Sequence, residues 1–283
     1  MKFAKEELRK YKTSEVCNLL GVSRSEYYRK PVKTDNEENE EEQAVINCFK
    51  KHKRNYGRVR IRRELLTEKG LTVSEYRIAR ILKKNGLVAK SGRTGKPKRP
   101  KPTEQQYIEE NLIKDKFSIS EPNYLWCSDI TELECRTCKI YLCGIIDVAT
   151  RRIVGWSIAR NQTQRIVQDC FEMAVGRNPT RPEGAVYHSD RGCQYTAKKT
   201  KEMIEKYGFR KSMSRPGTPS DNQPIESFWK TLELEMDDIS ELNFEEASRV
   251  IVEYIEMYYN SSRLHSGINY YIPNKFFTLI CVH

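Results

Sequence analysis

Three carboxylates in this chain lie inside short polar signatures, and they constrain the fold because their side chains must meet to act together. The signatures are Trp126-Cys-Ser-Asp-Ile-Thr131, His188-Ser-Asp-Arg-Gly-Cys-Gln-Tyr195 and Asp221-Asn-Gln-Pro-Ile-Glu-Ser-Phe-Trp229. They contain Asp129, Asp190 and Glu226, and 35 residues separate the last two. Carboxylates offer hard, acceptor-only oxygens, which suit Mg²⁺. Three such groups can hold two divalent ions against a phosphodiester, so the pattern predicts phosphodiester chemistry.

The segment that holds these signatures has a mixed pattern of strands and helices. Apolar, β-branched runs predict strands at Tyr124–Glu132, Lys139–Asp147 and Arg152–Ser157. A helix is expected over residues 163–176, and then a strand at Ala185–His188, a helix near 197–207 and a strand at Phe209–Met213. The order βββ-α-β-α-β-α is that of an RNase H-like core, so the predicted fold class is α/β with a mixed five-stranded sheet.

The predicted elements place each carboxylate within a strand, after a strand or at a helix start. Asp129 lies in the first strand, and Asp190 follows the short strand that ends at His188. Glu226 follows the capping run Ser220–Pro224, near a helix N-terminus whose dipole favours a phosphate. A solvated surface position is the alternative for any single carboxylate, but it does not account for all three.

Three neighbours of the carboxylates have two interpretations each. His188, at a strand end, is expected to make hydrogen bonds, with metal or DNA contact as the alternative. Trp126 and Trp229 are expected to pack in the core, with base stacking as the alternative.

Positive charge is concentrated in one segment. Residues 51–100 hold 17 Lys and Arg against 3 Asp and Glu, whereas the 283-residue chain has a net charge of +11, which leaves −3 for the rest. A basic block beside a near-neutral remainder predicts a module that binds a polyanion such as DNA, and a well-solvated helical surface is the alternative.

Two segments before the α/β region have helix-turn-helix patterns. In residues 14–30, Gly21 supplies the turn and Ser23 caps the second helix. The acidic stretch 35–42 is expected to be a linker that leads into a three-helix unit over residues 43–88. Eight cations of this unit are candidates for DNA contact: Lys53, Arg54, Arg58, Arg60, Arg77, Arg80, Lys83 and Lys84.

Residues 91–102 are rich in glycine, proline and positive charge, and they cannot form a core. A spacer that follows the phosphate backbone and an inert linker are both open interpretations.

The cysteines and the lack of long apolar runs indicate the compartment. Nine cysteines without an export signal predict reduced thiols, and no apolar run approaches the ~18 residues of a membrane span. We therefore expect a cytoplasmic, nucleoid-associated protein without a membrane partner. Cys135-Arg-Thr-Cys138 lies between two predicted strands and is expected to form a hairpin turn, with a zinc site or a redox pair as alternatives.

The motifs resemble those of the bacterial insertion-sequence family-three transposases, in particular the catalytic protein of the downstream reading frame. The similarity covers roughly residues 14 to 278. Besides the carboxylate signatures it includes Leu20-Gly-Val-Ser-Arg-Ser-Glu-Tyr-Tyr28, Tyr56-Gly-Arg-Val-Arg-Ile61, Tyr259-Asn-Ser-Ser-Arg-Leu-His265 and Pro273. The acidic triad is also similar to that of retroviral integrases.

This resemblance implies an integrase core in which Asp129, Asp190 and Glu226 hold two Mg²⁺ ions, with Mn²⁺ as a substitute. It implies a polynucleotidyl transferase that cuts double-stranded DNA at terminal inverted repeats and joins the 3′-hydroxyl ends to target DNA through a circular intermediate. A homo-oligomer on DNA and a partner protein from an upstream frame are also implied. Further candidates are Asn222 and Lys230 for DNA contact, and His188, Arg263 and His265 for accessory roles.

One position departs from the family pattern. The family has Lys or Arg seven residues after the catalytic glutamate, where this chain has Glu233, and Lys230 lies one turn earlier. The usual contact with the donor DNA end is therefore expected to differ.

Two other functions account for part of the pattern. A DNA-binding regulator or a domesticated, inactive integrase explains the basic segment but not the triad. An RNase H-like nuclease or junction resolvase explains the triad but does not need two helix-turn-helix units.

Four parts of the chain are expected. Residues 1–33 form a helix-turn-helix-like segment, 40–90 a helical DNA-binding domain and 91–120 a basic linker with a connecting helix. Residues 121–283 form the catalytic domain with a C-terminal helical extension.

Overall fold

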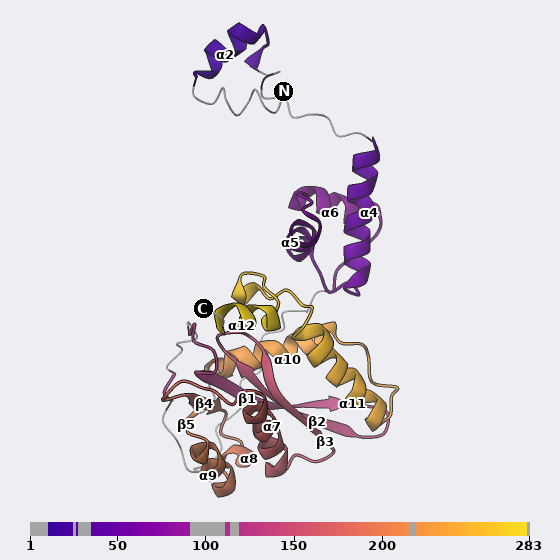
Figure 1. The fold of residues 1–283 in the computed structure, drawn as a ribbon. Helices are drawn as coiled ribbons and strands as arrows, with labels where there is room; N and C mark the ends of the chain where they lie inside the picture. The colour runs from indigo at the N-terminus through magenta and orange to yellow at the C-terminus, as the bar shows by residue number, and fades with distance from the viewer. Residues whose placement is uncertain are drawn as a thin grey trace.

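The α/β part of the chain is built on a five-stranded sheet in the order β3-β2-β1-β4-β5 (Figure 1). The computed structural model describes residues 11–24, 27, 35–90, 111–113, 119–215 and 219–281. The strands are β1 (Leu125–Glu134), β2 (Lys139–Asp147), β3 (Ile153–Ala159), β4 (Val186–Ser189) and β5 (Arg210–Met213). β1, β2 and β3 are antiparallel neighbours, whereas β4 is parallel to both β1 and β5. The predicted mixed sheet is therefore confirmed.

Helices cover both faces of this sheet because alternate side chains of each strand enter different cores. From β1, Trp126 enters a core with Phe171 and Phe209, whereas Cys127 enters a core with Phe228. Trp126 is fully buried, so its predicted packing is confirmed. The first core is closed by α7 (Gln164–Arg177), α8 (Cys193–Thr196) and α9 (Lys198–Lys206), and the second by α10 (Gln223–Glu235) and α11 (Phe244–Glu253).

The turn between β1 and β2 contains the Cys-x-x-Cys sequence. Glu134 pairs with Lys139 at the end of the antiparallel ladder, so Cys135 and Cys138 lie in the connection, as predicted. Their sulfur atoms are 3.8 Å apart and both thiols are free.

The helical unit contains α4 (Asp35–Lys51), α5 (Arg58–Lys69) and α6 (Glu75–Lys84) around an apolar core. α5 ends at Gly70, where φ is 62°, and α6 begins after Ser74, whose hydroxyl accepts a hydrogen bond from the Arg77 amide at 3.2 Å. These are the turn and the cap of a helix-turn-helix.

The expectation that residues 35–42 form a linker is wrong, because α4 begins at Asp35. Acidic residues are favourable in the first turns of a helix, where they face the positive end of its dipole. Glu41 and Glu42 also pair with Arg77 and Lys84 of α6, at 2.7 and 2.8 Å. These tertiary contacts stabilise a segment that the sequence presents only as acidic.

The first helix-turn-helix pattern lies only partly within the described residues. α2 (Thr13–Leu20) ends at Gly21, where φ is 62°, and the Tyr27 amide donates to the Ser23 carbonyl at 2.9 Å. Most of its second helix and the expected spacer 91–102 lie outside the described residues. Within the described ranges, no helix has the length and apolar character needed to cross a bilayer.

The helical unit contacts the end of α10 and the segment that follows α11 (Figure 1). This later segment continues through η3 (Tyr254–Tyr259), η4 (Ser266–Ile268) and α12 (Pro273–Cys281). Tyr56 is fully buried, and its hydroxyl accepts a hydrogen bond from the Leu264 amide at 2.8 Å. Asn55 Nδ2 donates to the Glu235 carbonyl at 3.2 Å. The contact between the two parts is therefore made by buried polar groups with defined partners.

Candidate active site

Two of the predicted catalytic carboxylates come from neighbouring parallel strands. Ser128 of β1 is in register with Ser189 of β4, so Asp129 and Asp190 are the next residues on the two strands. Asp129 lies partly buried within β1, whereas Asp190 is the first residue beyond β4 and is exposed. The Asp190 carboxylate accepts a hydrogen bond from the Gly192 amide at 2.9 Å. The parallel pairing brings together residues that are far apart in the sequence.

The third carboxylate is carried by α10, which packs over β1 and β2. Pro224 lies at the start of α10 and Glu226 in its first turn, as predicted, but the N-cap residue Asn222 makes no capping hydrogen bond and belongs to a 3-10 helix over Pro219–Asn222. One turn further along, Trp229 Nε1 donates a hydrogen bond to Asp129 Oδ2 at 3.0 Å. Trp229 is 6% exposed, so its predicted packing in the core is confirmed, and its indole also orients the Asp129 carboxylate.

Gly144 allows this contact and was not identified from the sequence. It pairs with Asp129 across β1 and β2, and a Cβ atom there would lie 2.7 Å from Cη2 of Trp229. Any other residue would displace the indole from the sheet. A glycine inside a strand is the signal that could have indicated this close approach.

Asn222 has a different role from the DNA contact expected of it. Its side chain is 4% exposed, and Nδ2 donates to the Ser128 carbonyl at 2.9 Å. Asp221 beside it accepts hydrogen bonds from the Arg215 amide and guanidinium. The pair fixes the start of α10 against β1, and a side chain so deeply buried does not reach a phosphate.

The three carboxylates affect one another electrostatically. Burial, and then the charge of nearby Asp190, raise the pKa of Asp129 to about 7. Desolvation also raises the pKa of Glu226, although Lys230 opposes this shift. Asp190 and Glu226 each act on Asp129, so the three groups repel one another when charged. A hard divalent cation would relieve this repulsion, and the oxygen-only donor set suits such an ion.

His188 lies beneath this site as a neutral, fully buried group. Its Nδ1 is 2.8 Å from Ser212 Oγ and its Nε2 is 3.0 Å from Ser214 Oγ. Burial lowers the pKa of His188 to about 4. The expected hydrogen-bonding role is confirmed, and both ring nitrogens are engaged by hydroxyl groups.

Arg263 and His265 are not brought to the carboxylates as hydrogen-bond partners. Arg263 is buried and forms a bidentate ion pair with Glu235 at the far end of α10, at 2.7 and 2.8 Å. His265 Nδ1 accepts from the Gly267 amide at 3.1 Å, and burial lowers the pKa of its ring to about 3. Arg263 therefore belongs to the contact with the helical unit, and the accessory role expected of it is corrected to a structural one.

Two of the eight cations expected to contact DNA, Lys53 and Arg60, pair with acidic residues of the other part of the chain, and Arg54 bonds within the helical unit. Lys53 pairs with Asp237 at 2.5 Å, and Arg54 Nε donates to the Val88 carbonyl at 3.1 Å. Arg60 Nη1 is 3.6 Å from the Glu235 carboxylate, and its side chain is 23% exposed. Arg60 is thereby committed to the contact between the two parts, whereas Lys53 and Arg54 are exposed and their contact with DNA stays a prediction.

The other five cations remain on the surface of the helix-turn-helix. Arg58, Arg77 and Lys84 form ion pairs with acidic side chains of the same unit. Arg80 and Lys83 are exposed on α6, and neither forms an ion pair within the described ranges. These two are therefore the cations of α6 that are most available to a phosphate.

Lys230 and Glu233 are both exposed on α10 beyond Glu226. Lys230 is close enough to act on the pKa of Glu226. Within the described part of the chain, Lys230 and Glu233 form no ion pair with each other. The negative charge of Glu233 is therefore not neutralised by its neighbour.

Comparisons with known proteins agree with this architecture. The family model of the integrase core domain matches residues 119–219, a second integrase core model matches residues 207–273, and the HTH-like domain model matches residues 35–94. Among solved structures, the HTLV-2 integrase catalytic core domain in complex with magnesium is similar, with 17% identity and a TM-score of 0.38 over 52% of this chain and 92% of that one.

Two curated relatives cover most of the chain. A transposase for insertion sequence element IS904 from Lactococcus lactis is 36% identical over 252 residues, which are 88% of this chain and 98% of the relative. Transposase InsF for insertion sequence IS3A from Escherichia coli is 30% identical over 281 residues, which are 97% of this chain and 96% of the relative. With an integrase core, an HTH-like domain and relatives that match along almost their whole length, this chain belongs to the IS3-family transposases.

Proposed function

We propose that Asp129, Asp190 and Glu226 are the catalytic residues of this insertion-sequence transposase and that they bind two Mg²⁺ ions, for which Mn²⁺ can substitute. The observation that carries the proposal is that Asp129 and Asp190 directly follow paired residues of β1 and β4, and that α10, which carries Glu226, binds Asp129 through Trp229. Bound metal ions would activate the attacking hydroxyl and stabilise the leaving oxygen of the phosphodiester. The test is strand transfer by the full chain on terminal-repeat DNA in Mg²⁺, with a chelator as the reference.

The chain's own residues orient the carboxylates for this chemistry. The Trp229 indole holds Oδ2 of Asp129 at 3.0 Å and thereby orients the carboxylate. The Gly192 amide fixes Asp190, and the first turn of α10 places Glu226 at the positive end of the helix dipole. The neighbouring core excludes water from one side of the site because Trp229 and Ile225 cover Gly144.

The same proposal assigns the remaining parts. Residues 40–90 bind duplex DNA of the terminal inverted repeats, and residues 121–283 catalyse cleavage and joining to target DNA. Residues 91–120 connect these two domains. Residues 1–33 supply a second helix-turn-helix. The protein acts as a homo-oligomer on DNA together with an upstream-frame partner, and it works in the bacterial cytoplasm at the nucleoid.

The affinity of the full chain for duplex DNA is expected to fall steeply as salt rises. Each neutralised phosphate adds about −0.9 to the slope of log K against log salt. Arg80→Ala and Lys83→Ala should therefore each reduce the slope by about one unit, because both cations are exposed and unpaired within the described residues. Lys53→Ala is the matched control, since Lys53 pairs with Asp237. Fluorescence-anisotropy titrations at several salt concentrations measure the slopes, and equal slopes for all four proteins would contradict the assignment.

Lys230 and Glu233 are expected to have opposite effects on the donor DNA end. A DNA end held at the carboxylates would pass the exposed face of α10, where Lys230 reaches a phosphate and Glu233 repels one. Lys230→Ala should weaken donor-end binding and strand transfer by roughly tenfold, the value of a charge-assisted hydrogen bond. Glu233→Lys should maintain or improve both. Strand-transfer assays on cognate ends measure this, and loss of activity in Glu233→Lys would assign the glutamate a positive role.

A further inference from the structure

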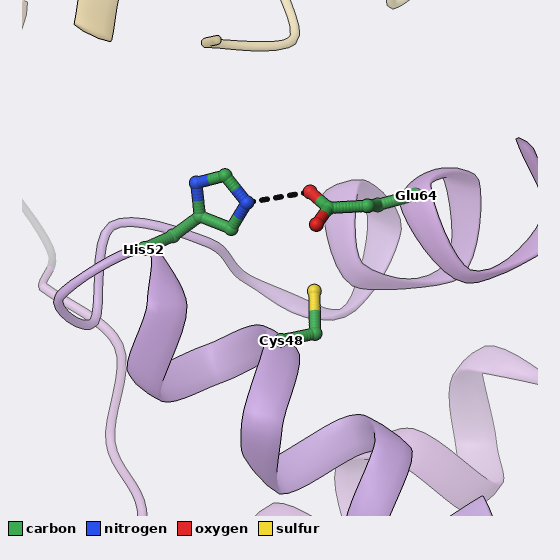
Figure 2. Close-up of side chains that lie close together, drawn as sticks. All are labelled: Cys48, His52 and Glu64. Carbon is green, nitrogen blue, oxygen red and sulfur yellow. Dashed lines mark ion pairs between the residues drawn. The ribbon is translucent and has the colours of Figure 1, made fainter. Parts of the chain in front are cut away.

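A second cluster of potential metal ligands lies in the helical unit, away from the three carboxylates. It consists of Cys48 of α4, His52 directly after the end of α4, and Glu64 of α5 (Figure 2). The three residues are 5%, 3% and 7% exposed. Their ligand atoms all lie within 4.8 Å of one another, and Figure 2 shows the sulfur, the ring and the carboxylate pointing towards one region between the two helices.

Helix geometry explains why these side chains meet. His52 is the first residue beyond α4, but its amide donates to the Cys48 carbonyl at 3.3 Å, so the two side chains, four residues apart, still lie one above the other. Glu64 is in the middle of α5, which packs against α4. Lys51 Nζ binds Glu64 Oε1 at 2.8 Å, which leaves Oε2 directed at His52 Nε2 at 2.5 Å. The arrangement therefore does not depend on chance contacts of long, exposed side chains.

The donor set is that of a borderline cation such as Zn²⁺, which takes cysteine sulfur, histidine nitrogen and carboxylate oxygen in tetrahedral sites. Zinc-to-ligand distances of about 2.0–2.3 Å place tetrahedral ligand atoms roughly 3.3–3.6 Å apart. On metal binding, the distance of 2.5 Å between His52 Nε2 and Glu64 Oε2 would lengthen by under about 1 Å. The Cys48 sulfur would move towards these two atoms by a similar amount. Side-chain rotations alone can make these adjustments.

We propose that Cys48, His52 and Glu64 bind a Zn²⁺ ion. The ion would cross-link α4 to α5 within the DNA-binding unit. The His52 ring stacks on Tyr56 at 3.6 Å between centroids, and Tyr56 receives the Leu264 amide hydrogen bond from the catalytic part. A metal ion bound to His52 would therefore also fix Tyr56, which joins the helical unit to the rest of the chain. This site is independent of the catalytic carboxylates.

Metal binding by the full chain tests the proposal. Protein stripped of metal and loaded with Co²⁺ should show a sulfur-to-cobalt charge-transfer band, and zinc-loaded protein should hold about one ion that resists dialysis. Cys48→Ala should abolish the band and lose the ion. Cys170→Ala is the matched control, because Cys170 is also a fully buried cysteine on a helix, and it should keep both.

The hairpin thiols provide the rival thiolate site. A Cys135→Ser, Cys138→Ser double variant should retain the cobalt band; loss of the band there, with retention in Cys48→Ala, would overturn the proposal. If Cys48→Ala fails to fold, X-ray absorption spectroscopy of the zinc-loaded wild-type chain still tests whether Cys48, His52 and Glu64 bind the ion. One sulfur at about 2.3 Å with nitrogen and oxygen at about 2.0–2.2 Å is expected, and a shell with no sulfur or with two would overturn it.

Discussion

Replacing Asp129 or Asp190 by Asn, or Glu226 by Gln, is expected to abolish end cleavage and strand transfer while DNA binding is retained. Each amide keeps the shape of the side chain but removes the charge that would hold a metal ion. Because residues of a catalytic unit act together, each single change should lower the rate on the order of a thousandfold or more. The cations of α6 are unchanged in these variants, so affinity for the terminal repeat should remain within about twofold of wild type.

Strand transfer with pre-cleaved terminal-repeat duplexes in Mg²⁺ measures this loss, and anisotropy on the same duplex measures binding. Asp169→Asn is the matched control, because Asp169 is an exposed carboxylate paired with Arg165 on the surface of α7, and it should have full activity. The products also separate transposase from nuclease, since joined DNA requires attack by a 3′-hydroxyl. Near wild-type joining by any one of the three variants would remove that residue from the proposed metal ligands.

Glu235→Gln is expected to destabilise the protein by roughly 3–5 kcal/mol, the cost of leaving a buried charge unpaired. Glu235 and Arg263 are 4% and 5% exposed, and the guanidinium is bound by both carboxylate oxygens. The Tyr254 hydroxyl also donates to Glu235 at 3.2 Å. The neutral amide would leave the guanidinium charge without compensation in a place that water does not reach.

Urea denaturation followed by circular dichroism measures the free energy of unfolding. Glu233→Gln, two residues earlier on α10 but exposed, should change it by less than about 0.5 kcal/mol. The double variant Glu235→Leu, Arg263→Met should recover much of the loss, because an apolar pair of similar volume avoids the unpaired charge. If Glu235→Gln changed the free energy of unfolding by less than about 1 kcal/mol, the ion pair between Glu235 and Arg263 would be far less buried in solution than in the structure.

Much of the catalytic domain could be predicted because its signals are local. Apolar, β-branched runs identified all five strands, and β2 spans the predicted Lys139–Asp147. Pro224 placed Glu226 in the first turn of α10. The three polar signatures identified the carboxylates that the sheet and α10 bring together. In each case the pattern of a few neighbouring residues determines the conformation, so no knowledge of distant contacts was needed.

Other positions were decided by contacts between distant segments. Lys53, Arg60 and Arg263 have the charge of DNA-binding residues, but the tertiary structure gives each of them an acidic partner. Asn222 became a buried support of β1 for the same reason.

What the sequence by itself determined is therefore the set of elements and the chemical groups that could act on a phosphodiester. The tertiary structure alone decided which cations remain free for DNA, why Gly144 lies under Trp229, and that Cys48, His52 and Glu64 converge. The physical reason is that periodicity and capping depend on residues a few positions apart, whereas the exposure of a polar side chain depends on which surface later covers it.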